Sequence, residues 1–136
     1  MQERPQAPQI SVRRGPTFDE DLARLRLDTE TQRALNDTIE EIRIALQENP
    51  NNPDKVRGGV PYPRDKHQTW KRRVGRPGSN IGKRGGLRLC YWWRRNEREI
   101  VLLFLYDKRE KADLMQREID KAKAAFPRPP SSSSST

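Results

Sequence analysis

The sequence contains few of the residue types on which most metal and nucleophile sites depend. Its 136 residues include one cysteine, Cys90, and one histidine, His67. A single cysteine excludes an internal disulfide and a zinc site built from several cysteines. The sequence also lacks a Walker loop, a dinucleotide-binding fingerprint and a Ser/His/Asp set. We therefore expect neither a bound metal ion nor a cofactor.

Long apolar segments are absent as well. The longest apolar run, Ile100–Tyr106, has seven residues, whereas a membrane-spanning helix needs about 20. Residues 1–8 contain no apolar stretch of the kind found in signal peptides. Together with the single cysteine, these absences favour a protein of the reducing cytoplasm.

Positive charge is what the sequence has in excess. The formal net charge is +9, and charged residues make up 35% of the chain, against roughly 25% in an average soluble domain. Residues 1–54 carry a net charge of −4, and residues 55–136 carry +13. Between Arg64 and Arg95 there are 11 basic residues and one acidic residue. A solvated surface usually mixes both signs, so this segment predicts a face that binds a polyanion.

The apolar spacing predicts one domain over residues 9–126, with unstructured tails at 1–8 and 127–136. It begins with a short strand over 9–13 and a helix over 18–25, for which Thr17 and Glu20 provide a capping box. A second helix runs from Asp28 or Thr29 to about residue 48, and residues 54–68 are irregular. Strands follow over 69–74, 86–93 and 99–106, and a helix over 114–125. This order predicts an α+β fold with a small antiparallel central sheet, covered by an N-terminal αα-hairpin.

The residues left for chemistry are mainly basic. Lys71 and Arg73 are two positions apart on a strand, so they share one face. Arg88 lies on the next strand, and the turn after the last strand adds Lys108, Arg109 and Lys111. If these strands pair, the cations converge into a group suited to holding and cleaving a phosphodiester. Arginine stabilises charge that develops on phosphorus, and a lysine among cations can exchange protons near neutral pH.

Aromatic and glycine-rich positions extend this hypothesis. Trp70 or Tyr106 could stack a base, although packing in the core is the alternative for both. Trp92 and Trp93 are adjacent in the sequence, so we expect one side chain to be buried and the other to be exposed. The loop Gly82–Gly86, with Lys83 and Arg84, is either a hairpin turn or a phosphate-contacting loop, and it can be both.

Three segments resemble the RelE/HigB toxin family, part of the RelE/ParE superfamily. They are Trp70-Lys71, the run GKRGGLRLCYWW at 82–93 and the run IVLLFLYDKREKADL at 100–114. The resemblance covers roughly residues 9–125 and is strongest from 82 to 114. It implies a RelE-like fold and the toxin of a bacterial type II toxin–antitoxin pair. Many such toxins are metal-independent endoribonucleases (mRNA interferases) that cut mRNA on the ribosome and inhibit translation. The 2′-OH attacks the adjacent phosphate, and a cognate antitoxin, often with a helix-turn-helix domain, neutralises the toxin.

The resemblance also implies roles for individual residues. The catalytic tyrosine of RelE falls near Met115, so Tyr106 is the tyrosine close enough to replace it. The implied catalytic residues are Lys71, Arg73, Arg88, Tyr106 and Arg109. The implied contacts to RNA or the ribosome are Trp70, Arg72, Lys83, Arg84, Lys108 and Lys111. Two alternatives stay open at this point: a ParE-like toxin directed at DNA gyrase, and an inactive relative that binds nucleic acid or regulates.

Overall fold

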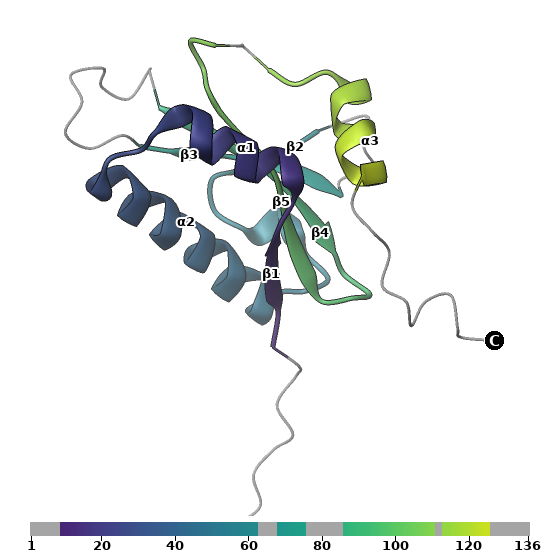
Figure 1. The fold of residues 1–136 in the computed structure, drawn as a ribbon. Coiled ribbons are helices and arrows are strands. Elements are labelled where there is room, and N and C mark those ends of the chain that lie inside the picture. Colours follow the sequence, from purple (N-terminus) through teal and green to yellow (C-terminus); the bar gives the residue numbers. More distant parts are fainter. Residues whose placement is uncertain (1–8, 63–67, 76–85, 111–112, 126–136) are drawn as a thin grey trace, which may run out of the picture.

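The computed structural model describes residues 9–62, 68–75, 86–110 and 113–125. The described residues form an α+β domain with a five-stranded mixed sheet and three α-helices (Figure 1). The α+β prediction is therefore confirmed, and the tails predicted at 1–8 and 127–136 lie outside the described residues. The elements are β1 (Ser11–Arg14), α1 (Pro16–Leu25), α2 (Thr29–Glu48), the 3₁₀ turn η1 (Pro53–Lys55), β2 (Gly59–Pro61), β3 (Thr69–Val74), β4 (Leu87–Arg94), β5 (Glu99–Asp107) and α3 (Gln116–Ala125).

The strands lie in the order β1-β5-β4-β3-β2. The centre of the sheet is antiparallel as predicted, because β3 pairs with β4 and β4 with β5 in opposite directions. The sheet as a whole is mixed, because β1 pairs with β5 in parallel, a pairing that was not predicted from the sequence. A parallel neighbour requires a long connection, and here most of the domain lies between the two strands. The strand β2 was also not predicted, since three residues are too few to show an alternating pattern.

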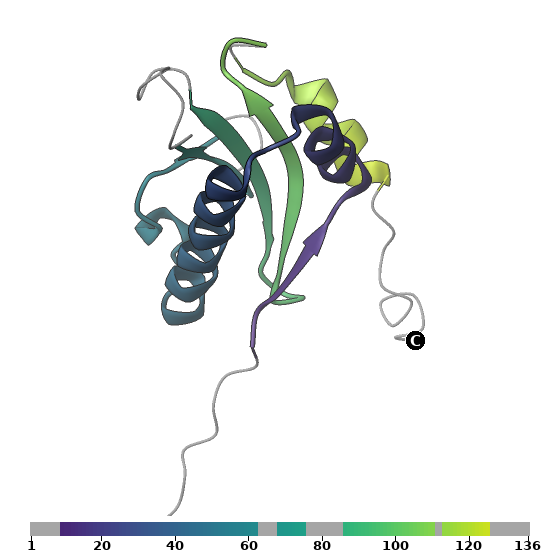
Figure 2. The same ribbon diagram turned by 60° about the vertical axis from the view of Figure 1, so that its left-hand side comes forward.

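The helices cover the two faces of the sheet unequally. The 20-residue α2 lies against one face, and the 10-residue α3 lies against the other (Figure 2). The helix α1 packs against β5 and also touches α3. We call the two sides the α2 face and the α3 face. Among the described residues, no helix is long and apolar enough to cross a membrane.

Alternation along each strand divides the side chains between two cores. Trp93 is buried on the α2 face and donates its indole N–H to the Pro50 carbonyl at 3.0 Å, whereas Trp92 is half-buried on the α3 face. The two tryptophans thus lie on opposite faces, and Trp93 is buried as one of them was expected to be, but Trp92 is half-buried where an exposed ring was expected. Sheet residues of the α2-face core are Trp70, Val74, Leu87, Leu89, Tyr91, Trp93, Ile100, Leu102 and Leu105. Sheet residues of the α3-face core are Cys90, Trp92, Val101, Leu103, Phe104 and Tyr106.

A β-bulge interrupts this alternation in β5. Cys90 lies opposite Phe104, but the next residue of β4, Tyr91, lies opposite Leu102. Leu103 is therefore the additional residue, and both Leu103 and Phe104 pack in the α3-face core. The bulge sets which side chains of the C-terminal half of β5 face α3.

The helix α1 begins differently from the prediction. It starts at Pro16 with Gly15 as N-cap and no side-chain cap, so the capping box of Thr17 and Glu20 is wrong. Proline has the φ angle of a first helical residue and needs no donor there, and it starts the helix before Thr17. The start of α2 is confirmed: the Asp28 carboxylate accepts the Thr31 backbone N–H at 2.7 Å.

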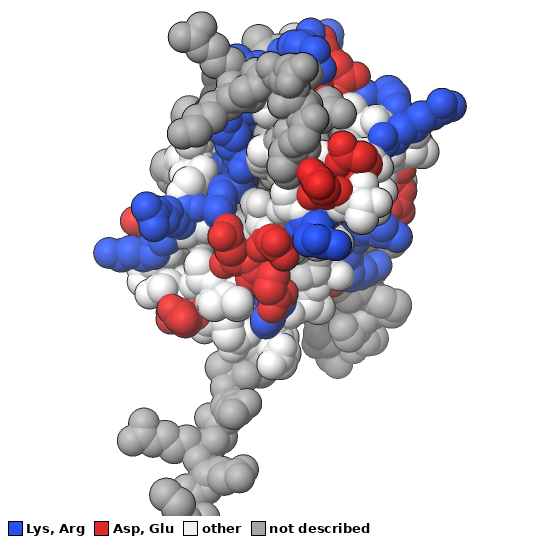
Figure 3. Space-filling view, turned by 90° about the vertical axis from the view of Figure 1, so that its left-hand side faces the viewer, with Lys and Arg blue, Asp and Glu red and all other residues white. Residues whose placement is uncertain are grey.

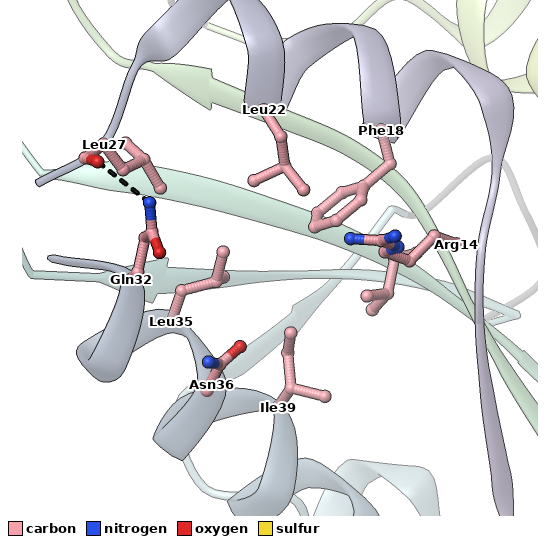
Figure 4. A pocket seen from close by; sticks show the side chains of 9 residues that line it. Arg14, Phe18, Leu22, Leu27, Gln32, Leu35, Asn36 and Ile39 are labelled. Carbon is pink, nitrogen blue, oxygen red and sulfur yellow. Dashed lines mark hydrogen bonds between the residues drawn. The ribbon is translucent and has the colours of Figure 1, made fainter. Parts of the chain in front are cut away.

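The predicted αα-hairpin is looser than expected. The helices α1 and α2 are consecutive, but they diverge rather than pack along their lengths (Figure 1). A cavity of about 360 Å³ lies between them, with walls formed mainly by Phe18, Leu22, Leu27, Leu35 and Ile39 (Figure 4). The helix that covers the α2 face is therefore chiefly α2.

Candidate functional site

Three predicted cations share the α3 face of the sheet. Arg73 on β3 lies directly opposite Arg88 on β4, and Lys71 lies two positions along β3 from Arg73. Arg73 is exposed, and Lys71 and Arg88 are half-buried. The predicted convergence of these three residues is confirmed, and we call the group the cationic site.

The register of the cationic site has an energetic consequence. Side chains directly opposite on antiparallel strands have Cβ atoms about 4.5–5.5 Å apart, and like charges there reduce stability. Among the described residues, neither Arg73 nor Arg88 forms an ion pair with a carboxylate. The Arg73–Arg88 pair is thus a local accumulation of positive charge, which an anionic ligand would relieve.

Backbone contacts bring the turn after β5 to the cationic site. The Arg88 guanidinium donates to the carbonyls of Gly86 and Leu87 at 3.3 and 3.4 Å. The Lys108 N–H points to the same Gly86 carbonyl at 3.5 Å. A side chain at Gly86 would place its Cβ 2.9 Å from the Val74 carbonyl oxygen, so glycine permits this close approach of β3 and β4. Gly86 therefore joins the turn, Arg88 and β3 at one corner of the sheet.

A polar cluster adjoins the cationic site at the start of α3. The Lys71 ammonium donates to Asp113 Oδ2 at 2.9 Å, and the Tyr106 hydroxyl donates to Asp113 Oδ1 at 3.4 Å. The Lys71 Nζ also lies 5.4 Å from the centre of the Tyr62 ring, a cation–π distance. The carboxylate of Asp113 thus bridges a cation on β3 and a phenol on β5.

The pKa values of the cluster follow from burial and charge. Burial raises the pKa of Asp113, but the hydrogen bonds from Lys71 and the Leu114 N–H outweigh it and hold the pKa below the ordinary aspartate value. Burial raises the pKa of Tyr106 to about 12 and raises the pKa of Tyr62 further. At neutral pH Asp113 is therefore a carboxylate, and both phenols keep their protons.

Burial contradicts the base-stacking role predicted for Trp70 or Tyr106. Trp70 is 2% exposed and packs in the α2-face core, away from the cationic site. Tyr106 is on the correct face, but it is 3% exposed and packs in the α3-face core. A protonated and enclosed phenol is also poorly suited to accept a proton from RNA, which argues against Tyr106 as a general base.

The other predicted contacts are distributed around the molecule. Arg72 points to the α2 face, where it pairs with Glu41 at 2.8 Å, so it does not belong to the cationic site. Arg109 is largely exposed and pairs with Asp107 at 3.1 Å, a hydrogen bond that raises the pKa of Arg109. Lys108 is exposed in the same turn. The predicted contacts Lys83, Arg84 and Lys111 lie outside the described residues.

Two functional candidates, Asp113 and Tyr62, were missed by sequence reasoning. Asp113 stands in the motif DKREKADL that carries part of the family resemblance, but its spacing alone assigned it no role. Tyr62 follows β2, a strand that the sequence pattern did not predict. Within the described ranges, no group of three or more His, Cys, Asp or Glu side chains is placed to hold a metal ion.

The opposite side of the molecule has a different electrostatic character. Basic and acidic side chains lie next to each other on the side shown in Figure 3. Arg43 pairs there with Glu40 along α2, and Arg72 pairs with Glu41. On the α2 side, Arg43 and Arg72 are therefore both paired with carboxylates of α2.

The sequence matches no family model, and it matches no curated protein. The residues and their placement therefore provide the basis for a functional proposal.

Proposed function

We propose that this protein is a RelE/HigB-like toxin that cleaves mRNA on the bacterial ribosome without a metal ion. The observation that carries the proposal is the cationic site, where Arg73 and Arg88 lie directly opposite each other beside Lys71. The arrangement of one strand, two helices, further strands and a last helix supports the same family, as do the motifs at 82–93 and 100–114.

Charge density favours a phosphodiester as the ligand. Phosphate offers several acceptor oxygens, and arginine donates to it in a planar, charge-assisted geometry. An anion bound between Arg73 and Arg88 would replace their mutual repulsion with two attractive contacts. RNA is the polyanion that the family resemblance indicates, and the strongly basic half of the chain agrees with it.

The chemistry requires little from the protein beyond position and charge. The 2′-OH of a ribose gives up its proton as its oxygen attacks the adjacent phosphorus, the bond from phosphorus to the 5′-oxygen breaks, and the 5′-oxygen takes up a proton, so that a cyclic phosphate and a free 5′-OH result without net proton gain or loss. Arg88 stabilises the charge on the phosphoryl oxygens, because its guanidinium is held near the strand end by Gly86. Arg73 and Lys71 position the backbone, and Lys108 and Arg109 extend the positive field at the turn.

The proposed function also indicates which molecules this protein would bind. The ribosome and mRNA supply the substrate in the cytoplasm. A cognate antitoxin would neutralise the toxin by laying acidic segments over the half of the chain that carries a net charge of +13.

The test compares three proteins expressed in a bacterial host: the wild type, Arg88→Ala and Arg43→Ala. Arg43 is a matched control, because it is an ion-paired arginine of α2 on the opposite side of the sheet. Growth is followed, and the 5′ ends of mRNA are mapped. We expect arrest and new cuts within reading frames for the wild type and for Arg43→Ala, and neither for Arg88→Ala.

Other outcomes would point elsewhere. Arrest with intact mRNA and damaged DNA would replace the proposal with a gyrase-directed toxin. Binding of RNA without cleavage, with a graded and salt-dependent loss in every cation variant, would indicate an inactive binding protein.

A further inference from the structure

Among the residues that the structure describes, Asp113 is the carboxylate that contacts the cationic site. It pairs with Lys71 at 2.9 Å and accepts a hydrogen bond from Tyr106 at 3.4 Å. The Lys71 side chain is 27% exposed, so the pair is at the border between the polar cluster and the solvent. Arg73 and Arg88 have no comparable carboxylate among the described residues.

We propose that Asp113 is a positioning residue that fixes the Lys71 ammonium beside Arg73 and Arg88 for cleavage. This inference rests on the proposed function and deepens it. A lysine side chain has four rotatable carbon–carbon bonds and loses much rotamer freedom when it is held in one geometry. Asp113 holds the ammonium at one end, and the face of Tyr62 lies beside it. Lys71 is thereby placed before RNA arrives.

The arrangement has a second part, in which Tyr106 holds Asp113. The two oxygens of the carboxylate are engaged separately, Oδ2 by Lys71 and Oδ1 by the Tyr106 hydroxyl and the Leu114 N–H. The buried Tyr106 ring gives the carboxylate a rigid support on β5. Tyr106 thus acts on the site through Asp113, in place of the direct catalytic role that its burial disfavours.

Anchoring of α3 does not by itself explain Asp113. The helix α3 is attached to the sheet by Leu114, Ile119 and Ala122, all buried in the α3-face core. Its first turn is capped by Glu118, which accepts the Met115 N–H at 2.9 Å. Asp113 is 48% exposed at its side chain and lies before the helix begins.

The experiment measures ribosome-dependent mRNA cleavage by wild type, Asp113→Asn, Asp113→Glu and Glu110→Gln. Asparagine retains an oxygen for the Leu114 N–H but removes the charge that holds Lys71. Glu110 is the matched control, because it is a carboxylate of the same turn that pairs with Arg24 of α1. The cleavage rate at saturating ribosome concentration and the concentration for half-saturation are determined separately.

We expect Asp113→Asn to lower the saturated rate by about 10- to 100-fold, the range typical of a misplaced catalytic group. The half-saturating concentration should stay the same or fall, because removal of a negative charge makes the surface more attractive to RNA. Asp113→Glu should recover part of the rate, and Glu110→Gln should cleave like the wild type. In a Lys71→Ala background, Asp113→Asn should have no further effect on the rate.

Two results would overturn the inference. If the Asp113→Asn variant cleaves mRNA at the wild-type rate, the ion pair does not position Lys71. An equal loss of rate in the Lys71→Ala and wild-type backgrounds, with a lower unfolding midpoint, would make Asp113 a purely structural residue. Failure of the proposed function is distinguishable, since the wild type itself would then leave mRNA intact.

Discussion

The two faces of the sheet use the same kinds of residue for different purposes. On the α2 face, a 20-residue helix covers an apolar surface, and Arg72 is neutralised by Glu41. On the α3 face, a 10-residue helix covers part of the surface, and Arg73 lies opposite another arginine. Arg72 and Arg73 are neighbours in sequence, but the strand directs them to opposite sides.

The difference shows that charge in this chain must be assigned by face and not by segment. The basic segment from Arg64 to Arg95 is continuous in sequence, yet its described part contributes both to a charge-balanced side and to an unbalanced one. The ion-paired arginine on the α2 face contributes to the stability of the domain, and the α3 face, where Arg73 lies opposite Arg88, is the candidate for binding. Three measurements test this division.

The largest effect should come from removing a core side chain on each face. Ile42 of α2 is 1% exposed and Ile119 of α3 is 0% exposed. A change to alanine should lower the free energy of unfolding by about 2–5 kcal/mol at a well-packed site. We expect Ile42→Ala to destabilise the whole domain, and Ile119→Ala to increase hydrogen exchange mainly in α3. Uniform exchange throughout the domain in both variants would contradict a separation of the two cores.

An intermediate effect should distinguish the two neighbouring arginines. Arg73→Gln removes a like-charge pair, so the free energy of unfolding should rise by a few tenths of a kcal/mol. The same change should weaken RNA binding and reduce its salt dependence by about one ion. Arg72→Gln removes an ion pair, so stability should fall by about 0.5 kcal/mol, with a smaller effect on RNA binding. Chemical denaturation and RNA titrations at several salt concentrations measure both quantities, and a reversed order would invalidate the assignment by face.

The smallest effect concerns the acid titration of two aspartates, Asp21 on α1 and Asp113 before α3. Burial raises the pKa of Asp21 despite its hydrogen bonds with the Leu105 N–H and Arg24, whereas the pKa of Asp113 is lowered by Lys71. A lowered pKa gives Asp113 a stabilising contribution that is present above about pH 3.9 and is lost as the pH falls further. The raised pKa of Asp21 has the opposite sign, so its contribution improves as the pH falls through its pKa. Carboxyl NMR titration should therefore find the Asp21 midpoint above that of Asp113, and the reverse order would refute both assignments.

Much of the fold could be predicted because the local residue patterns, such as alternation and helix caps, agree with the elements that form. The strand Thr69–Val74 was predicted at its observed bounds, and the cap of α2 follows directly from Asp28. The parallel pairing of β1 could not be predicted, because a strand pattern gives side-chain faces but no direction of pairing.

The site was predictable where the alternation of side chains along a strand alone determines which face of the sheet they share. Period-two spacing places Lys71 and Arg73 on one face, and pairing adds Arg88. Burial of Trp70 and Tyr106 was not predictable, because an aromatic side chain suits both a core and a stacked base. The contact between Lys71 and Asp113 spans 42 positions, and such distant pairs depend on how α3 packs after β5.

The bulge at Leu103 gives β5 two phases of alternation. Before it, odd-numbered residues face α3, as Val101 does, and after it even-numbered residues do, as Tyr106 does. Deletion of Leu103 would remove the bulge, restore one-to-one pairing with β4 and leave Tyr106 on the side of α3, where it contacts Asp113. For comparison with a strand that lacks the bulge, an alignment gap placed away from Leu103 would match every position between the gap and the bulge to the wrong side of the sheet.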